Sequence, residues 1–368
     1  MGGKRRGKSQ PGRRRGGRGA FARAIGVSDL ASYRGYAFAW FSEAATLLLA
    51  NCSLEDLRNK GVGSVVPKLL QSLSAKMAAR KGKTIDPKLV RPLPFAAKDP
   101  KDRMTLEFAL QTLQGLVEGR RPGPLSPPSA LSLDFAEFTR SSMGRGQLKR
   151  DAFRVGEDVL ALSLVGAYLT RAYRARTEGG RWEYGYILVN VRSPALAAAM
   201  LDRMQAGVLG VTRRVVEGGG GFFPILVGAA AAIARALGGQ LREVAKSPLL
   251  VEYLRLSKGE KVMAKGFDVF DVTGLATLLR RGGIAGTVYW LVRSFPKEEG
   301  YNNYRGFVQR LSEGLAKYHM YRRPEHLYAP LRALCSRDLQ AEAVKLFGAR
   351  WQGLSQRIQG GLSRLAGL

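Results

Sequence analysis

Few residues in this sequence have the type and spacing needed for metal chemistry. The two histidines, His319 and His326, are seven residues apart, and Cys335 follows nine residues later. Zinc usually takes four ligands, often in closely spaced pairs, and this trio has neither the number nor the spacing. The sequence also contains no adjacent His–Asp pair, which argues against a histidine–aspartate metal nuclease. We therefore predict no metal site.

The carboxylates and cysteines form no better catalytic pattern. The pairs Asp134/Glu137 and Glu298/Glu299 lie in polar segments, whereas acid–base catalysis usually places one carboxyl group in apolar surroundings. Either cysteine would need a histidine base that the sequence does not place beside it. We predict a binding protein with no catalytic residues and no cofactor. Two cysteines in 368 residues also favour a reducing, cytoplasmic setting.

One glycine-rich segment could bind phosphate. The pattern GxxxxGK[ST] is absent, which argues against a P-loop ATPase. In EGGGGFF, residues 217–223, four glycines precede Pro224 and a predicted helix, so their backbone N–H groups could approach an anion. Four glycines between two elements more often form a hinge. We interpret the segment as a hinge, with a phosphate cradle as the alternative.

The charge balance predicts a polyanionic partner. The chain has 59 Lys and Arg against 29 Asp and Glu, a formal net charge of +30. Residues 1–20 hold eight of the bases and no acid, so residues 21–368 keep a net charge of +22. Such an excess destabilises the compact state unless a polyanion is near, and nucleic acid is the expected polyanion.

Basic residues gather in three segments behind the N-terminal arm: residues 68–103, 258–266 and 275–323. The last segment includes YWLVRSFPKEEGYNNYRGF, where aromatics alternate with bases. Aromatic rings can stack on bases, and asparagine can bind adenine edges. The alternative for YNNYRGF is helix capping and packing. The predicted nucleic-acid-binding residues are Lys81, Lys83, Lys88, Arg91, Lys258, Lys261, Lys265, Arg280, Arg281, Asn302, Asn303, Tyr304, Arg305, Arg322 and Arg323.

The elements that must position these residues are mostly helical. Apolar residues at helical spacing predict helices over 30–50, 65–80 and 102–119. Residues 158–175 and 181–191 are expected to form two long strands of a hairpin, followed by a short helix. Residues 261–272 are expected to be a strand or a pair of loops. Further helices are predicted over 223–237, 240–257, 272–281, 283–294, 302–319, 327–334, 337–348 and 350–365.

The predicted fold class is α+β, with a helical N-terminal region, a central antiparallel sheet containing a long hairpin, and a C-terminal helical bundle. We expect a disordered Gly/Arg-rich arm over 1–20, an N-terminal α/β body over 21–221 and a mainly helical bundle over 222–368. Within the body, 23–119 would be helical, 120–129 a linker and 150–192 the sheet. The apolar run 222–234 is shorter than a membrane span, so we expect a buried helix and no membrane partner.

Three C-terminal segments resemble a known family: LLVEYLRLSKGEKVMAKGFDVFD, YWLVRSFPKEEGYNNYRGFVQRL and RPEHLYAPLRALCSR. They are similar to the large subunit of the archaeal type I-A CRISPR Cascade, and the similarity, in the order of a basic α/β body and a helical bundle, covers about residues 25–350. The Gly/Arg arm is not expected of that family. The resemblance maps no functional residue, so the predicted binding residues depend on charge alone.

The resemblance implies a nucleic-acid-binding subunit of a CRISPR RNA-guided interference complex. Such a subunit would recognise the protospacer-adjacent motif and hold the target or displaced DNA strand, while the guide reads the sequence. The implied partners are CRISPR RNA, double-stranded target DNA and the backbone and small subunits of Cascade, with a helicase and nuclease in trans. The alternatives are another ribonucleoprotein or DNA-packaging protein that binds mainly through charge, and a nuclease with an unrecognised carboxylate site.

Overall fold

A computed structural model describes residues 24–78, 86–135, 154–177, 179–191, 193 and 196–367. It confirms the predicted α+β class, with a four-stranded antiparallel sheet and a helical C-terminal region. The strands pair in chain order: β3 (Arg171–Arg176), β4 (Trp182–Val191), β5 (Leu249–Lys258) and β6 (Val262–Asp271). The predicted basic arm, residues 1–20, lies outside the described residues.

The N-terminal region is helical as predicted, but the helix predicted over 30–50 is divided in two at residues 34–36. Residues Val27–Tyr33 form a 3₁₀ helix, η1, and Ser53 caps α2 by accepting a hydrogen bond from the Asp56 backbone N–H. Residues 124–125 and 155–156 pair as a separate two-stranded sheet, β1–β2. The elements of this region are α1 (Ala37–Ala50), α2 (Leu54–Lys60), α3 (Val62–Ala78), η2 (Lys101–Met104) and α4 (Leu106–Val117).

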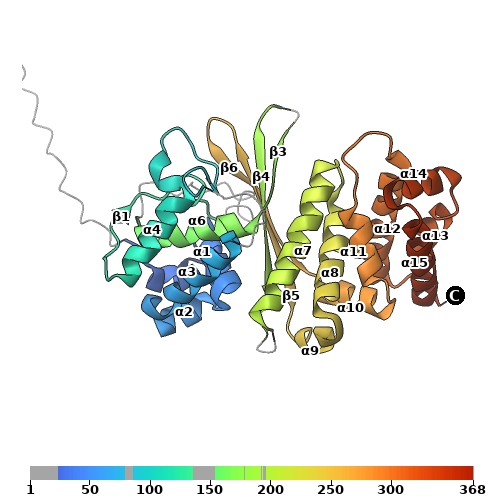
Figure 1. Cartoon of the computed structure of the whole chain (residues 1–368), viewed down its shortest axis with the longest axis horizontal. Helices are drawn as coiled ribbons and strands as arrows, with labels where there is room; N and C mark the ends of the chain where they lie inside the picture. The colour runs from blue at the N-terminus through green and yellow to red at the C-terminus, as the bar shows by residue number, and fades with distance from the viewer. Residues whose placement is uncertain are drawn as a thin grey trace, which may run out of the picture.

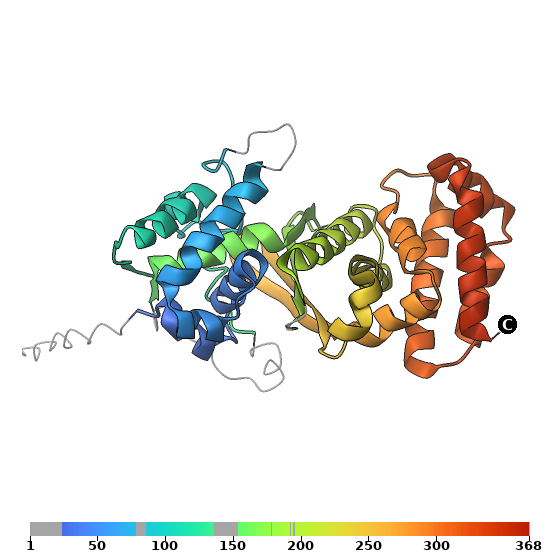
Figure 2. The same cartoon turned by 60° about the horizontal axis from the view of Figure 1, so that its bottom comes forward.

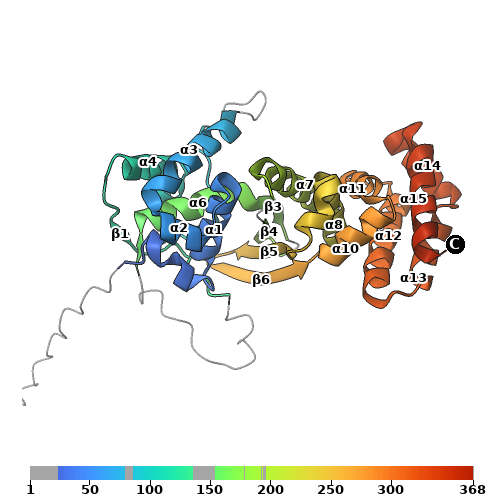
Figure 3. The ribbon, with the colours of Figure 1, turned by 90° about the horizontal axis from the view of Figure 1, so that it is seen from below.

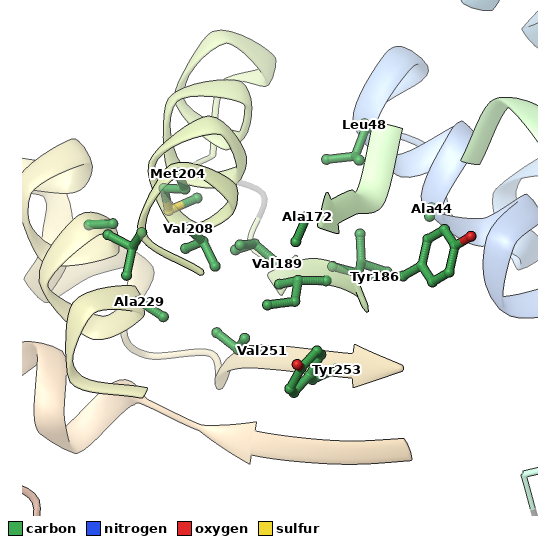
Figure 4. Close-up of a cluster of buried hydrophobic side chains, with 14 of the residues drawn as sticks. Ala44, Leu48, Ala172, Tyr186, Val189, Met204, Val208, Ala229, Val251 and Tyr253 are labelled. Carbon is green, nitrogen blue, oxygen red and sulfur yellow. The ribbon is translucent and has the colours of Figure 1, made fainter. Parts of the chain in front are cut away.

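The four-stranded sheet lies between two groups of helices (Figures 1 and 3). On one face, Phe41 of α1 packs edge-on against Tyr186 of β4, with ring centroids 5.0 Å apart. On the other face lies α7 (Ala198–Glu217), whose Met204 and Val208 point toward Val189 of the sheet (Figure 4). Both faces of the inner strands are therefore buried, and the sheet is the central layer of the molecule.

One predicted strand is a helix over most of its length. Glu157–Thr170 form α6, and only Arg171–Arg176 form a strand, β3. The α6 side chains are buried on nearly every side, so its sequence has no polar face to reveal the helical period. A Cβ atom at Gly166 would overlap the Phe41 carbonyl oxygen, because α1 and α6 cross there in close contact.

A second prediction, a helix over 240–257, is also wrong. Only Gly238–Gln240 and Leu241–Val244 are helical, as η5 and α9, and Leu249–Lys258 form β5. Strand β5 pairs with β4 over ten residues, from Trp182↔Lys258 to Val191↔Leu249. The sheet thus extends beyond the predicted range 150–192. The predicted boundary between the N-terminal body and the C-terminal bundle, at residue 221, falls between the two hairpins of this sheet. The helix predicted as short, α7, is 20 residues long.

The remaining C-terminal helices agree with the sequence prediction. They stack at the end of the molecule opposite the N-terminal helices (Figure 2). Trp351 is buried there, 6.0 Å from Phe347 and 6.3 Å from Phe307, measured between ring centroids. The elements are α8 (Phe222–Leu237), α10 (Thr273–Arg281), α11 (Ala285–Arg293), α12 (Asn302–Tyr321), α13 (Glu325–Ala333), α14 (Arg337–Phe347) and α15 (Arg350–Ala366).

One helical stretch of the described residues, Phe222–Val244, is long and apolar enough to cross a membrane. The bent pair α1–α2 passes the same test only if both helices are counted as one span. In the first stretch 61% of the apolar window is buried within the fold, and α8 packs there against α7, α10, α11 and α12. The core helix of a soluble protein is placed in this way, so the described residues are compatible with a soluble protein.

Candidate nucleic-acid interface

Two β-hairpins project together beyond the helices (Figure 1). One joins β3 to β4 and the other joins β5 to β6, and β4 pairs with β5, so the two tips lie at the same end of the sheet. At this end Trp182 lies between Arg176 of β3 and Lys258 of β5. Residues directly opposite one another in antiparallel strands share a face, so these three side chains lie on one face of the tip.

The same face carries an arginine stacked on an exposed indole ring. The Arg174 guanidinium carbon is 3.9 Å from the Trp182 ring centroid and 5.7 Å from that of Tyr184. Trp182 is 36% exposed, whereas Tyr184 is buried. Cation–π stacking holds the guanidinium flat, and the indole keeps part of its surface in solvent.

A loop from the N-terminal half completes the tip. The Arg91 guanidinium carbon is 5.3 Å, and Lys258 Nζ 4.3 Å, from the Phe95 ring centroid. Arg171 donates a hydrogen bond to the Arg91 carbonyl oxygen at 3.1 Å, and Tyr186 donates one to the Pro92 carbonyl at 2.9 Å. The fold therefore brings together Arg91 and Lys258, two predicted residues from distant segments. The hairpin-tip surface comprises Arg91, Phe95, Arg174, Arg176, Trp182 and Lys258.

The hairpin-tip surface keeps its positive charge. In the described part of the chain, no carboxylate forms an ion pair with its arginines or with Lys258. Glu183, the nearest strand carboxylate in sequence, lies on the opposite face and accepts a hydrogen bond from the Tyr173 hydroxyl at 2.6 Å. That hydroxyl is also 2.7 Å from the Tyr253 hydroxyl, and burial raises the pKa of Tyr173, so the group stays neutral.

Three other predicted lysines are exposed, two of them in the β5–β6 hairpin. Lys261 lies in the β5–β6 turn, and Lys265 lies in β6 where the register with β5 shifts. Lys88 is exposed, with its Nζ 3.8 Å from Glu107, a surface pair that contributes little to stability. Lys81 and Lys83 lie outside the described residues.

The second aromatic cluster, at the start of α12, differs from its prediction. Tyr304 has 0% exposure, its hydroxyl donates to the Leu291 carbonyl oxygen at 2.8 Å, and its ring packs against Phe347 and Trp351. A ring in this position cannot stack on a base, so the prediction for Tyr304 is corrected. Its sequence signal, aromatics among bases, came from a buried helical stripe.

Asn303 and Arg305 are held by the protein itself. Asn303 Nδ2 donates to Glu342 Oε1 at 2.8 Å, and the same carboxylate accepts the Tyr304 backbone N–H at 2.8 Å. Glu342 thus caps the N-terminus of α12. Arg305 donates to the Glu298 carbonyl oxygen at 2.7 Å. Capping and packing, the alternative interpretation of this segment, therefore account for Asn303, Tyr304 and Arg305.

The other predicted residues of this half are exposed at helix ends. Arg280 and Arg281 occupy the last turn of α10, and Asn302 is the first residue of α12. Arg322 follows α12 in the left-handed region, with φ 57°, and Arg323 is 4.0 Å from Glu325. These five residues belong to the C-terminal helices and are not part of the hairpin-tip surface.

The glycine run forms a tight connection between α7 and α8. The N–H groups of Gly218, Gly219 and Gly220 donate to carbonyl oxygens of the last turn of α7 at 3.0, 3.1 and 2.7 Å. Gly219 has φ +72°, a conformation that favours glycine. Because three of the four N–H groups are already bonded within the chain, the geometry contradicts the phosphate cradle.

The remaining reactive groups are dispersed. Among the described residues, no cluster of three or more His, Cys, Asp or Glu could hold a metal ion. Burial raises the pKa of Cys52, which favours the thiol over the nucleophilic thiolate. Burial and the nearby Arg322 lower the pKa of His319, so its imidazole is neutral near pH 7.

Sequence reasoning missed Phe95, Arg174, Arg176 and Trp182. The alternation in RAYRAR and RWEYGY places Arg174 and Arg176, and separately Trp182 and Tyr184, on one face of each strand. That signal was available, but the place of Phe95 beside Lys258 depends on tertiary packing. Comparisons with family models, curated proteins and solved structures found no match to this chain.

Proposed function

We propose that this chain binds nucleic acid through the hairpin-tip surface. The observation that carries the proposal is the Arg174 guanidinium stacked 3.9 Å from the centroid of the exposed Trp182 ring, at the end of a projecting hairpin. An exposed aromatic ring flanked by cations can stack on a base while the cations bind the neighbouring phosphates. Arg91 and Lys258, both close to the Phe95 ring, extend the cationic surface.

The geometry favours a single-stranded segment over an intact duplex. Bases inside a duplex are stacked on one another, so an exposed indole has access to a base only where the strands are separated. Each phosphate bound on a single strand contributes roughly −0.7 to the slope of log K against log salt. Binding at this surface is therefore expected to weaken steeply as salt rises.

A charge-matched comparison tests the proposal. In the test variant Arg174, Arg176 and Lys258 become Gln; in the control, the exposed residues Arg242, Arg337 and Arg350 become Gln. Fluorescence anisotropy with labelled single-stranded DNA, single-stranded RNA and duplex DNA measures Kd at several salt concentrations. With single-stranded probes, the test variant should make the slope of log K against log salt less negative by about 2, and the control should leave the slope almost unchanged. Equal losses of affinity in the two variants would contradict binding at the hairpin-tip surface.

The finer proposal follows from the resemblance to the Cascade large subunit. The bound strand would be target or displaced DNA in a CRISPR RNA-guided complex, and the chain would read the adjacent motif without cutting DNA. Two measurements support or overturn it. A small RNA with a constant repeat-derived end should copurify from the native host, and affinity for duplexes should depend on a short sequence beside the target. Absence of both would leave only general nucleic-acid binding.

The two alternatives have their own tests. If the basic arm dominates binding, as in a DNA-packaging protein, deletion of residues 1–20 should abolish the affinity, whereas the hairpin-tip proposal expects a modest loss. If the chain is a nuclease, labelled DNA or RNA should be cut in Mg²⁺ or Mn²⁺ after extensive purification. We propose that cleavage belongs to a separate helicase and nuclease, so the expected result is intact substrate.

A further inference from the structure

Three helices line a partly open cavity on the C-terminal side of the sheet. It lies where α7, α8 and α11 meet, and its volume is about 490 Å³. Its small lining residues are Ala206 and Gly207 of α7 and Ala232 and Ala236 of α8. Small side chains at this crossing leave space that larger ones would fill. The volume lies within the range of about 300–1,000 Å³ that is usual for small-molecule sites.

Each of the three helices contributes one arginine to the cavity: Arg203 from α7, Arg235 from α8 and Arg293 from α11. No carboxylate in the described part of the chain forms an ion pair with any of them. Asp202, next to Arg203, pairs with Lys76, and Glu243, the acid nearest Arg235 in sequence, pairs with Lys246. Arg203 and Arg235 are exposed and Arg293 is partly buried. Three guanidinium groups that line one cavity without an ion-paired acid repel one another, and a bound anion would reduce that repulsion.

The protein holds Arg235 in place by stacking and leaves room beside Gly210 for Arg293. The Arg235 guanidinium carbon is 4.7 Å from the Tyr289 ring centroid and 5.4 Å from that of Trp290. Stacking on a ring leaves the in-plane N–H groups free to bind phosphate oxygens. Arg293 extends across Gly210 of α7, where a Cβ atom would overlap its Nη1. A glycine at 210 therefore permits the side chain to reach the cavity.

We propose that this pocket binds the phosphate of a nucleotide-sized ligand. Planar guanidinium groups bind phosphate in pairs of parallel hydrogen bonds, and three of them match its several oxygens. The volume exceeds the needs of phosphate alone and leaves room for the rest of a nucleotide; Trp290, which is 47% exposed and 5.4 Å from the Arg235 guanidinium carbon, is not itself a lining residue. The phosphate could belong to a free nucleotide or to the end of a strand. This proposal goes beyond the hairpin-tip surface and does not depend on it.

Isothermal titration calorimetry with the full chain tests the pocket. The probes are pyrophosphate, ADP, ATP and a tetranucleotide with either a 5′-phosphate or a 5′-hydroxyl. Binding of ADP or ATP assigns the pocket to a free nucleotide, and preference for the 5′-phosphorylated tetranucleotide assigns it to a strand end. Either result supports the proposal if Arg203→Gln, Arg235→Gln and Arg293→Gln each weaken binding by about tenfold or more. Binding of no probe at millimolar concentration and low salt overturns it.

A glycine substitution distinguishes binding in this pocket from nonspecific attraction of anions to a positively charged chain. Gly210→Ala keeps every charge and suits the helix, yet it should displace Arg293 and weaken probe binding by about tenfold. Gly353→Ala, in the exposed part of α15 with open space around it, is the control and should leave binding unchanged. Equal effects of the two substitutions would contradict the pocket. The hairpin-tip triple variant should still bind ADP or ATP, so failure of one proposal does not imply failure of the other.

Discussion

Two segments rich in arginine and aromatic residues have opposite surroundings in this molecule. In the hairpin tip, RAYRAR and RWEYGY place Arg174 over a Trp182 ring that remains 36% exposed. At the start of α12, YNNYRGF buries Tyr304 completely and binds Asn303 to Glu342. The difference arises because a projecting strand exposes one face beyond its helices, whereas an amphipathic helix turns its aromatic stripe inward.

The largest effect on stability is expected at Tyr304. Tyr304→Ala removes a fully buried ring that packs on Phe347 and Trp351, so the free energy of unfolding should fall by about 3–5 kcal/mol. Urea unfolding followed by circular dichroism measures the change. Single-stranded DNA affinity, measured under conditions where the variant is still folded, should stay within twofold of the unsubstituted chain. A large loss of affinity with little loss of stability would reverse the roles of the two segments.

The next effect concerns the close packing beneath the hairpin tip. A Cβ atom at Gly185 would overlap the Tyr173 ring, which lies on the opposite face from Trp182. Gly185→Ala should therefore cost about 1–3 kcal/mol of stability by displacing that ring. Thermal unfolding compares it with Gly179→Ala, in the adjoining turn, where a Cβ atom meets open space. Equal melting temperatures for the two variants would contradict the packing argument.

Substitution of the exposed Trp182 ring is expected to reduce nucleic-acid binding more than stability. Trp182→Ala should weaken single-stranded DNA or RNA binding by about 1–3 kcal/mol, the worth of one stacked base. Because the ring is partly in solvent, stability should change less than for Tyr304→Ala. Anisotropy titrations and urea unfolding on the same samples separate the two quantities. Trp182→Phe retains a ring and should recover part of the affinity, whereas recovery by Trp182→Leu would argue against stacking.

A smaller effect on stability is expected when the pH is raised. Burial raises the pKa of Tyr173 in the folded state above the value of about 10 for an exposed tyrosine. Stability is therefore fully present below pH of about 10 and declines as pH rises above it, because only the unfolded chain readily loses the proton. Tyr173→Phe should make that alkaline decline shallower in urea unfolding at pH 8 to 11. The same slope in both proteins would indicate that other groups control it.

Sequence reasoning predicted the amphipathic helices well and the fully buried elements poorly. In α12 and α15 a polar face makes the helical period visible. In α6 and β5 nearly every side chain is buried, so the pattern that separates helix from strand is lost, and the two were assigned to the wrong class. Burial by neighbouring layers decided these cases, and one sequence does not reveal which layers will meet.

The candidate site was predictable only in part. Arg91 and Lys258 were identified from charge, but their convergence on Phe95 depends on a sheet register set by pairing between β4 and β5. Assigning 158–175 to a single strand obscured the short arginine-rich strand at its end. The arginine pocket had no local signal, because Arg203, Arg235 and Arg293 belong to three separate helices.

Photo-crosslinking is the most direct test of the proposal that nucleic acid binds at the hairpin-tip surface. Single-stranded DNA carrying 5-bromodeoxyuridine is bound to the full chain and irradiated, and the attached peptides are identified by mass spectrometry. We expect crosslinks at Trp182 and Phe95 that disappear when Arg174, Arg176 and Lys258 are replaced by Gln. Crosslinks confined to residues 1–20 or to the start of α12 would contradict the assignment of binding to the hairpin tip.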